Sequence, residues 1–198
     1  MKNHRIIFLT IPFLFLSCCT NKTNRTTAEV DSIFTNRLNL ILSDLGNLRL
    51  NDIQLREQEW GGVENTPDYK LGIGESYYPN PNKYEIDTVI VYLINENSLI
   101  ENSITHYATK DSGLIRVIFL EWKEPFLINP NLQKKADETF RNILTFLEDN
   151  IVQEAGKHIE YKEEKNYIDR IWKTSSGFTI TLENMKNFNR IRMVIYKD

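Results

Sequence analysis

Residues 104–122, ITHYATKDSGLIRVIFLEW, contain the pattern from which we infer the fold. Two apolar stretches, 104–109 and 114–122, flank the polar segment Lys110-Asp111-Ser112-Gly113, in which glycine accepts the positive φ that a tight turn requires. β-branched and aromatic residues are frequent in both stretches, as is typical of strands. The sequence therefore predicts an antiparallel hairpin in this stretch.

Further strands are expected on both sides of the hairpin. Residues 84–94, YEIDTVIVYLI, are apolar on both faces, which predicts a central strand covered on both sides. Period-two alternation also predicts strands upstream, at Leu48, Leu50, Ile53 and Leu55 and at Tyr69, Leu71 and Ile73, and the apolar runs predict strands downstream over 158–161, 167–173, 178–182 and 191–196. We read Gly72 and Gly74 as strand glycines that another backbone approaches closely.

Two amphipathic helices complete the predicted fold. The first begins at a capping box of Thr26 and Glu29 and ends at Gly46, and the second has Asn129 as cap, Pro130 in its first turn and Gly156 past its end. Apolar residues recur at spacings of three and four in both. We predict an α+β fold for residues 29–198, in which antiparallel β-sheet meanders carry two amphipathic helices in one domain.

The order helix, meander, helix, meander raises the question of an internal duplication. Ser175-Ser176-Gly177 repeats the turn chemistry of Asp111-Ser112-Gly113, and each turn precedes an apolar strand. The similarity of two short turns is compatible with an internal duplication and also with coincidence.

The N-terminus has the order of a secretory signal. A basic start with Lys2 and Arg5 is followed by the apolar run 6–16, and then by Ser17, Cys18 and Cys19. Eleven residues in a helix span about 16 Å, and a bilayer core is roughly 30 Å thick, so the run is too short for a transmembrane helix.

This segment resembles the signal of a bacterial lipoprotein, in which the first cysteine of the mature chain takes a diacylglyceryl group. The resemblance covers the leader alone and implies a signal peptide at 1–17, lipidation of Cys18 with Cys19 as the alternative, and a polar tether at 18–28. Because no acidic run follows the cysteine, we expect the outer membrane and its periplasmic face. The high content of Asn, Ile and Lys resembles that of Bacteroidota proteins.

Charge and cysteine content narrow the classes of function. Without residues 1–17 the chain has 22 basic and 27 acidic side chains, a net charge of −5, and we expect no nucleic-acid partner. With two cysteines, one of them lipidated, no intramolecular disulfide is expected. Small acidic envelope lipoproteins of this size are similar in location and charge to immunity proteins, which inhibit an imported toxin.

The sequence contains no recognisable catalytic motif. His106 and His158 belong to no metal-binding arrangement, and no G-x-S-x-G elbow occurs, so we expect no cofactor and no metal. Acidic residues are frequent between the helices, and two of them facing one cleft would form an acid and base pair; the candidates are Glu57, Glu59, Glu64 and Glu75.

An aromatic, acidic surface is the remaining candidate site. Trp60, Tyr77 and Tyr78 lie in segments rich in Gly, Pro and Asn, near Glu59 and Glu75. Aromatic residues on loops dominate many protein interfaces, so these five residues are the predicted partner surface. The alternative is that each ring folds over the edge of the core.

Three functions follow from these observations. We expect a non-enzymatic protein-binding module anchored in the envelope, of the immunity or inhibitor kind. The alternatives are an accessory component of an envelope assembly, and a small-ligand binder or hydrolase.

Overall fold

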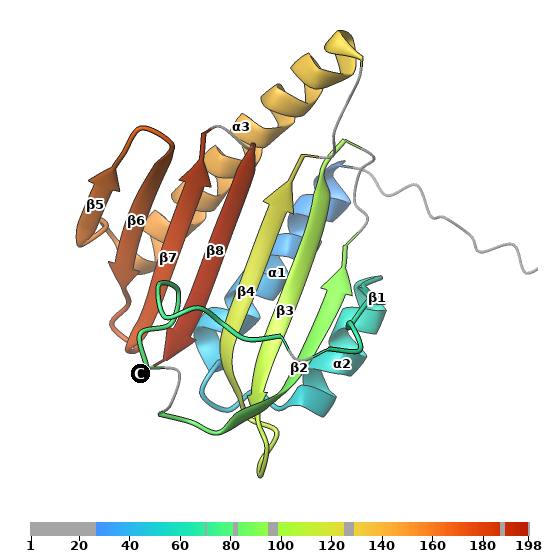
Figure 1. Ribbon diagram of the computed structural model, residues 1–198, viewed down its shortest axis with the longest axis vertical. Helices are drawn as coiled ribbons and strands as arrows, with labels where there is room; N and C mark the ends of the chain where they lie inside the picture. Colours follow the sequence, from blue (N-terminus) through green and yellow to red (C-terminus); the bar gives the residue numbers. More distant parts are fainter. Residues whose placement is uncertain are drawn as a thin grey trace, which may run out of the picture.

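The computed structural model contains one eight-stranded, fully antiparallel sheet (Figure 1). It describes residues 27–69, 71–80, 83–94, 99–124, 129–186 and 189–197, and for 27–34 the backbone alone. The strand order is β1-β2-β3-β4-β8-β7-β6-β5. The strands are β1 (Val63–Glu64), β2 (Ile86–Leu93), β3 (Glu101–Thr109), β4 (Ile115–Lys123), β5 (Glu160–Glu163), β6 (Tyr167–Lys173), β7 (Phe178–Met185) and β8 (Arg190–Lys197).

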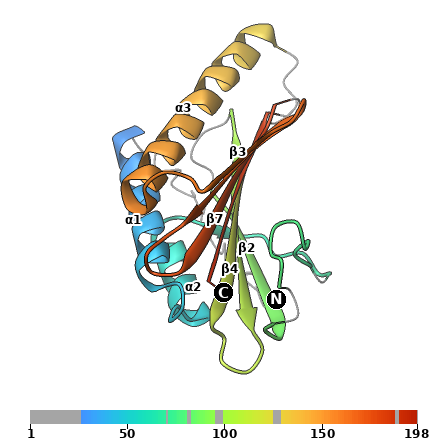
Figure 2. The same ribbon diagram turned by 90° about the vertical axis from the view of Figure 1, so that its left-hand side faces the viewer.

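Three helices cover one face of the sheet (Figure 2). They are α1 (Thr27–Asp44), α2 (Leu50–Glu59) and α3 (Pro130–Ala155). The main core lies between them and the sheet, where buried side chains of the helices, such as Leu38, Ile53 and Leu147, pack with the strand residues. The strands contribute every second residue to this core, as the pleat requires.

The predicted α+β class is confirmed, and so are its two clearest elements. β3 and β4 form the hairpin, and Gly113 has φ of 62° in the turn between them. At the start of α3 the side chain of Asn129 accepts a hydrogen bond from the backbone N–H of Asn131. Gly156 ends the helix with a φ of 75°. Trp122 and Trp172 are core residues, as expected from their strands.

The strand predicted from Leu48, Leu50, Ile53 and Leu55 is wrong, because these residues lie in or just before a third helix, α2. Leu50 and Ile53 are spaced by three and face the core, whereas Leu55 is exposed. The straight-chain residues Gln54, Arg56, Glu57, Gln58 and Glu59 all favour helix, and this preference outweighs two short alternations.

The strand predicted from Tyr69, Leu71 and Ile73 is also wrong. No strand occurs in 65–69, 71–80 or 83–85, which we call the strap, and a Cβ on Gly72 would have nothing within 4 Å. The strap connects β1 to β2 and crosses the face of the sheet that the helices leave open (Figures 1 and 2).

The strap also explains why residues 84–94 are apolar on both faces. The prediction that this strand is central is wrong. β2 is second from the edge of the sheet, beside the two-residue strand β1. Ile90 and Tyr92 are buried on the helix side. Val89 packs on the other side in a second, smaller cluster with Tyr84 of the strap.

Among the described residues, α1 and α2 precede the four sequential strands β1–β4, and α3 precedes β5–β8; the last strand of each half, β4 or β8, pairs with the other at the centre. The two Ser-Gly turns are not equivalent in this arrangement. One joins the third and fourth strands of its half, and the other joins the second and third. The two halves therefore have the same order of strands in the sheet, but the two similar turns do not occupy the same place in that order.

The signal peptide, the lipidation of Cys18, the capping box and nearly all of the tether fall outside the described residues. Within the described part, no helix combines the length and the apolar character that crossing a membrane requires.

Candidate functional site

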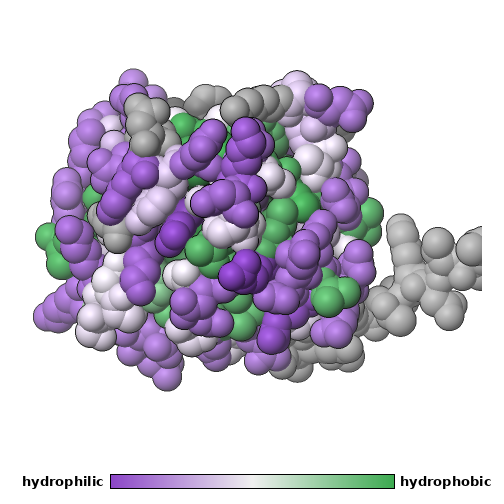
Figure 3. Space-filling model, turned by 90° about the horizontal axis from the view of Figure 1, so that it is seen from below, coloured by the Kyte–Doolittle hydropathy of each residue, from purple (hydrophilic) through white to green (hydrophobic). Residues whose placement is uncertain are grey.

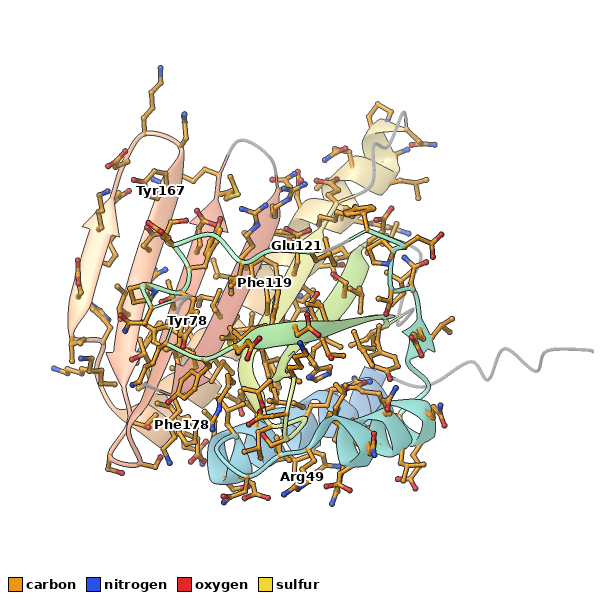
Figure 4. All side chains as sticks on the ribbon, turned by 60° about the horizontal axis from the view of Figure 1, so that its bottom comes forward. Arg49, Tyr78, Phe119, Glu121, Tyr167 and Phe178 are labelled. Atoms are coloured by element: carbon orange, nitrogen blue, oxygen red, sulfur yellow. The ribbon has the colours of Figure 1, made fainter. Side chains whose placement is uncertain are left out.

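The sheet face opposite the helices, which we call the open face, is the candidate site. The strap covers part of it, and Tyr78 of the strap packs edge-on against Tyr196 of β8 with 5.2 Å between ring centroids. Tyr77 packs in the same way against Phe119 of β4, at 5.6 Å. Figure 4 shows Tyr78, Phe119 and Glu121 on this face, and Tyr167 farther along it on β6.

The structure brings Tyr77 and Tyr78 to the open face, but in different roles. Tyr78 is 0% exposed and belongs to the small cluster under the strap. Tyr77 is half-buried, and its hydroxyl donates a hydrogen bond of 3.0 Å to Glu183 on β7. Tyr78 therefore holds the strap in place, and Tyr77 is the tyrosine that contacts polar groups of the face.

The structure does not bring Trp60 to the tyrosines. Trp60 follows α2 and packs against the main core on the helix side, with the guanidinium of Arg37 5.2 Å from its ring centroid. Glu59 at the end of α2 and Glu75 in the strap are exposed. The five predicted surface residues are therefore divided between the two sides of the sheet, and the ring of Trp60 folds over the core.

A row of charged side chains crosses the open face from β5 to β4. The strand registers pair Lys162 with Asp169, Asp169 with Glu183, Glu183 with Arg192 and Arg192 with Glu121. Directly opposed residues in antiparallel strands have Cβ atoms about 4.5–5.5 Å apart. These five residues, which we call the charged row, are therefore neighbours across five strands.

Arg192 organises the covered end of the charged row. Its Nε donates a hydrogen bond of 2.7 Å to Glu121, and the guanidinium also donates to the hydroxyl of Tyr77. Its distance to Glu183 is longer, at 3.5 Å. Burial and the neighbouring Glu183 carboxylate raise the pKa of Tyr77, so this hydroxyl stays protonated and acts as a donor.

Asp169 lies at the uncovered end of the charged row. Burial raises the pKa of Asp169 to about 6, and repulsion from Glu183 acts in the same direction. Its Oδ1 atom is buried and makes no hydrogen bond to any residue that the structure describes. Lys162 is the facing cation, but its ammonium group bonds to Glu164 at 2.9 Å and to the Tyr167 hydroxyl at 2.8 Å.

Sequence reasoning missed the charged row, although one signal was present. Asp169 and Arg170 are adjacent charges in the strand segment YIDRIW, and Glu183 follows the segment FTITL. Successive side chains of a strand point to opposite faces, so Asp169 and Arg170 lie on different faces of the sheet, and Arg170 pairs with Glu148 of α3 on the helix side. Asp169 pairs with Glu183 because of the register between β6 and β7, which cannot be read from the sequence.

Glu57, a candidate for an acid and base pair, is instead part of a buried ionic group. It is 0% exposed, and its Oε2 atom accepts hydrogen bonds of 3.0 and 3.2 Å from Arg37. Its Oε1 atom lies 3.5 Å from Nε2 of the buried His106 on β3. The group joins α1, α2 and β3 on the helix side and is closed to solvent, so we assign it a structural role.

The remaining candidates do not converge with Glu57. Glu64 on β1 is exposed and accepts a hydrogen bond of 3.3 Å from Thr66. His158 is exposed beside the rings of Tyr161 and Trp172. Among the described residues, no three His, Cys, Asp or Glu side chains are grouped so as to hold a metal ion.

Comparison of the chain with protein families, with curated proteins and with solved structures gave no match.

We predict that Glu57→Ala lowers the free energy of unfolding by about 3–5 kcal/mol, because it removes the carboxylate that faces the buried Arg37 guanidinium. Urea denaturation measures this. The matched control is Glu101→Ala, which removes an exposed carboxylate 2.7 Å from Lys123 and should cost less than about 1 kcal/mol. Equal effects of the two variants would contradict a structural role for the buried group.

We predict that Asp169→Asn changes the pH dependence of stability. The folded protein holds a proton on Asp169 up to about pH 6, while the unfolded chain releases it near pH 4, so stability falls as the pH rises through this window. The variant lacks this loss and should be more stable at pH 7.5 by roughly 1 kcal/mol, a figure reduced for solvent screening.

Thermal unfolding of both proteins from pH 4 to pH 8 tests this prediction. Asp149→Asn, which removes an exposed carboxylate from α3, is the control and should parallel the native protein. A constant difference between Asp169→Asn and the native protein at every pH would refute the assignment.

Proposed function

We propose that this protein is a lipid-anchored protein-binding module of the bacterial envelope, without catalytic activity, that binds its partner with the open face. An immunity or inhibitor protein is the form of this function that we favour. The observation that carries the proposal is the open face itself, where aromatic, apolar and charged side chains lie together on the strands beyond the strap.

The composition of the open face supports protein binding. Tyr167, Ile171 and Thr181 are partly exposed on strands β6 and β7, and Asp169 and Glu183 lie among them. Aromatic and aliphatic groups supply buried area at an interface, and charged groups determine which partner fits. The net charge of −5 after the leader favours fast association with a basic partner.

The leader supports the anchor. Ser17 and Cys18 follow directly on the apolar run 6–16. Each buried methylene contributes about 0.8 kcal/mol to membrane attachment, so two or three acyl chains on one cysteine hold a protein lastingly. We place the domain at the periplasmic face of the outer membrane, with the tether 18–28 between lipid and fold.

One observation favours the second function, an accessory component of an envelope assembly. Leu55, Val63 and Tyr69 are large apolar or aromatic residues, each more than half exposed, in the short stretch from α2 to the strap. Permanent partners bury more apolar surface than transient ones. On the end of the molecule that carries the β3–β4 turn, however, hydrophobic residues lie scattered among hydrophilic ones (Figure 3).

Photo-crosslinking in the native cells tests the proposed function. A photoreactive phenylalanine replaces Tyr167 on the open face in one strain and Val152 on α3 in a control strain, followed by purification and mass spectrometry. We expect one stoichiometric secreted protein at position 167 and none at position 152. Capture of several envelope proteins from both positions would support the assembly function, and absence of capture at position 167 would contradict binding by the open face.

Substitution of the cysteines tests the anchor. Cys18→Ala should remove the lipid and release the protein from the membrane fraction, because one thiol carries the attachment. Cys19→Ala is the matched control and should remain bound. Membrane retention of Cys18→Ala equal to that of the native protein would refute lipidation at Cys18, and release of Cys19→Ala in its place would assign the lipid to Cys19.

A further inference from the structure

The strand β5 forms one edge of the sheet, and among the described residues no element lies along its outer side (Figure 1). All four residues of β5 are exposed. A strand at the edge of a sheet offers unpaired backbone N–H and C=O groups to another chain. The outer side of β5 is therefore a place where a further strand could join the sheet.

The hydrogen bonds between β5 and β6 show which backbone groups of this edge point outward. The N–H of Glu164 donates to the carbonyl of Tyr167 at 2.9 Å, one position beyond the paired residues of the two strands. Bonded and non-bonded pairs alternate along antiparallel strands. The backbone groups of Lys162 consequently face β6, whereas the N–H and C=O groups of Tyr161 and Glu163 point away from the sheet.

The side chains of β5 fit a second copy of the same strand. In an antiparallel pair with a two-fold axis at Tyr161, Glu160 of each copy is opposed to Lys162 of the other. Opposite charges and aromatic rings that are directly opposed stabilise a strand pair. Glu160 has no ion-pair partner among the described residues. Lys162 donates to Glu164 and to Tyr167 and stays half exposed, so it is accessible to a second carboxylate.

The same charges exclude the other registers centred on β5. An axis at Glu160, Lys162 or Glu163 would oppose that residue to its own copy, and like charges in this relation are destabilising. An axis between two residues would oppose an outward-pointing residue to one that is bonded to β6, which an antiparallel ladder does not allow. Charged side chains usually keep an edge strand from pairing, but here their order admits the register at Tyr161.

We infer that a second copy of this chain pairs with β5, antiparallel and with the two-fold axis at Tyr161. The ring of Tyr161, which is 47% exposed, then lies against its own copy. Opposed residues of a ladder lie on the same face of a sheet, so the open faces of the two copies join into one surface. This inference goes beyond the proposed function and does not depend on the partner that the open face binds.

Photo-crosslinking at the axis tests the inference on the full-length protein in its native cells. A photoreactive phenylalanine replaces Tyr161, and we expect a covalent product of two copies of this chain, identified by its doubled mass and by mass spectrometry. Leu55, an exposed residue of α2, is the control position and should give no such product. Equal yields of the doubled product at both positions, or none at position 161, would overturn the inference.

Charge reversals combined with the photoreactive residue at position 161 test the register. Glu160→Lys and Lys162→Glu each place like charges opposite one another, so each should lower the yield of the doubled product by about tenfold or more. The two changes together oppose unlike charges again and should restore the yield, which a defect in folding would not do. Lys135→Glu, the same change on an exposed residue of α3, is the control and should leave the yield unchanged.

The charge reversals can also contradict the inference. An unchanged yield in the single variants, or a double variant that is no better than either, would overturn the pairing at Tyr161. Capture of another protein at position 167 is a separate result, so failure of the pairing leaves the proposed function standing.

Discussion

The pairing of β4 with β8 is the constraint on which the rest of the structure depends. It joins the two halves of the chain through seven residue pairs, from Val117 with Tyr196 to Lys123 with Arg190. Closing so long a loop costs entropy, which the burial of Ile118, Leu120, Met193 and other side chains beneath the helices offsets. The same pairing places Arg192 beside Glu121, and it therefore creates the covered end of the charged row as well as the centre of the core.

A sheet with helices on one side leaves its other side facing water. In this protein the strap covers part of that side. Tyr78 lies fully buried against Tyr196, and Tyr77 contacts both an apolar ring and the charged row. The strap thus covers the apolar strand residues near β2 and β8 and leaves β5 and β6 open. Part of the face is therefore covered, and the rest is the surface that we propose for partner binding.

The elements that could be predicted are those whose signal is local. The β3–β4 hairpin has its turn glycine at the required position, and α3 has cap, proline and terminal glycine in order over a long apolar stripe. α2 was missed because ten residues with one buried apolar residue, Ile53, and one partly buried, Leu50, resemble a short strand. The strand predicted around Gly72 is wrong. The strap is held there by contacts with strands distant in sequence, such as that of Tyr78 with Tyr196.

The sequence by itself determined the α+β class, the long helix, the hairpin and the burial of Trp122 and Trp172, because period and capping are properties of neighbouring residues. Tertiary structure alone decided which polar groups meet. Asp169 faces Glu183 because the β6–β7 register aligns them, and Trp60 lies apart from Tyr77 because α2 and the strap take opposite sides of the sheet. A shift of one residue in register would reverse the face of every side chain, so the charged row exists through long-range pairing.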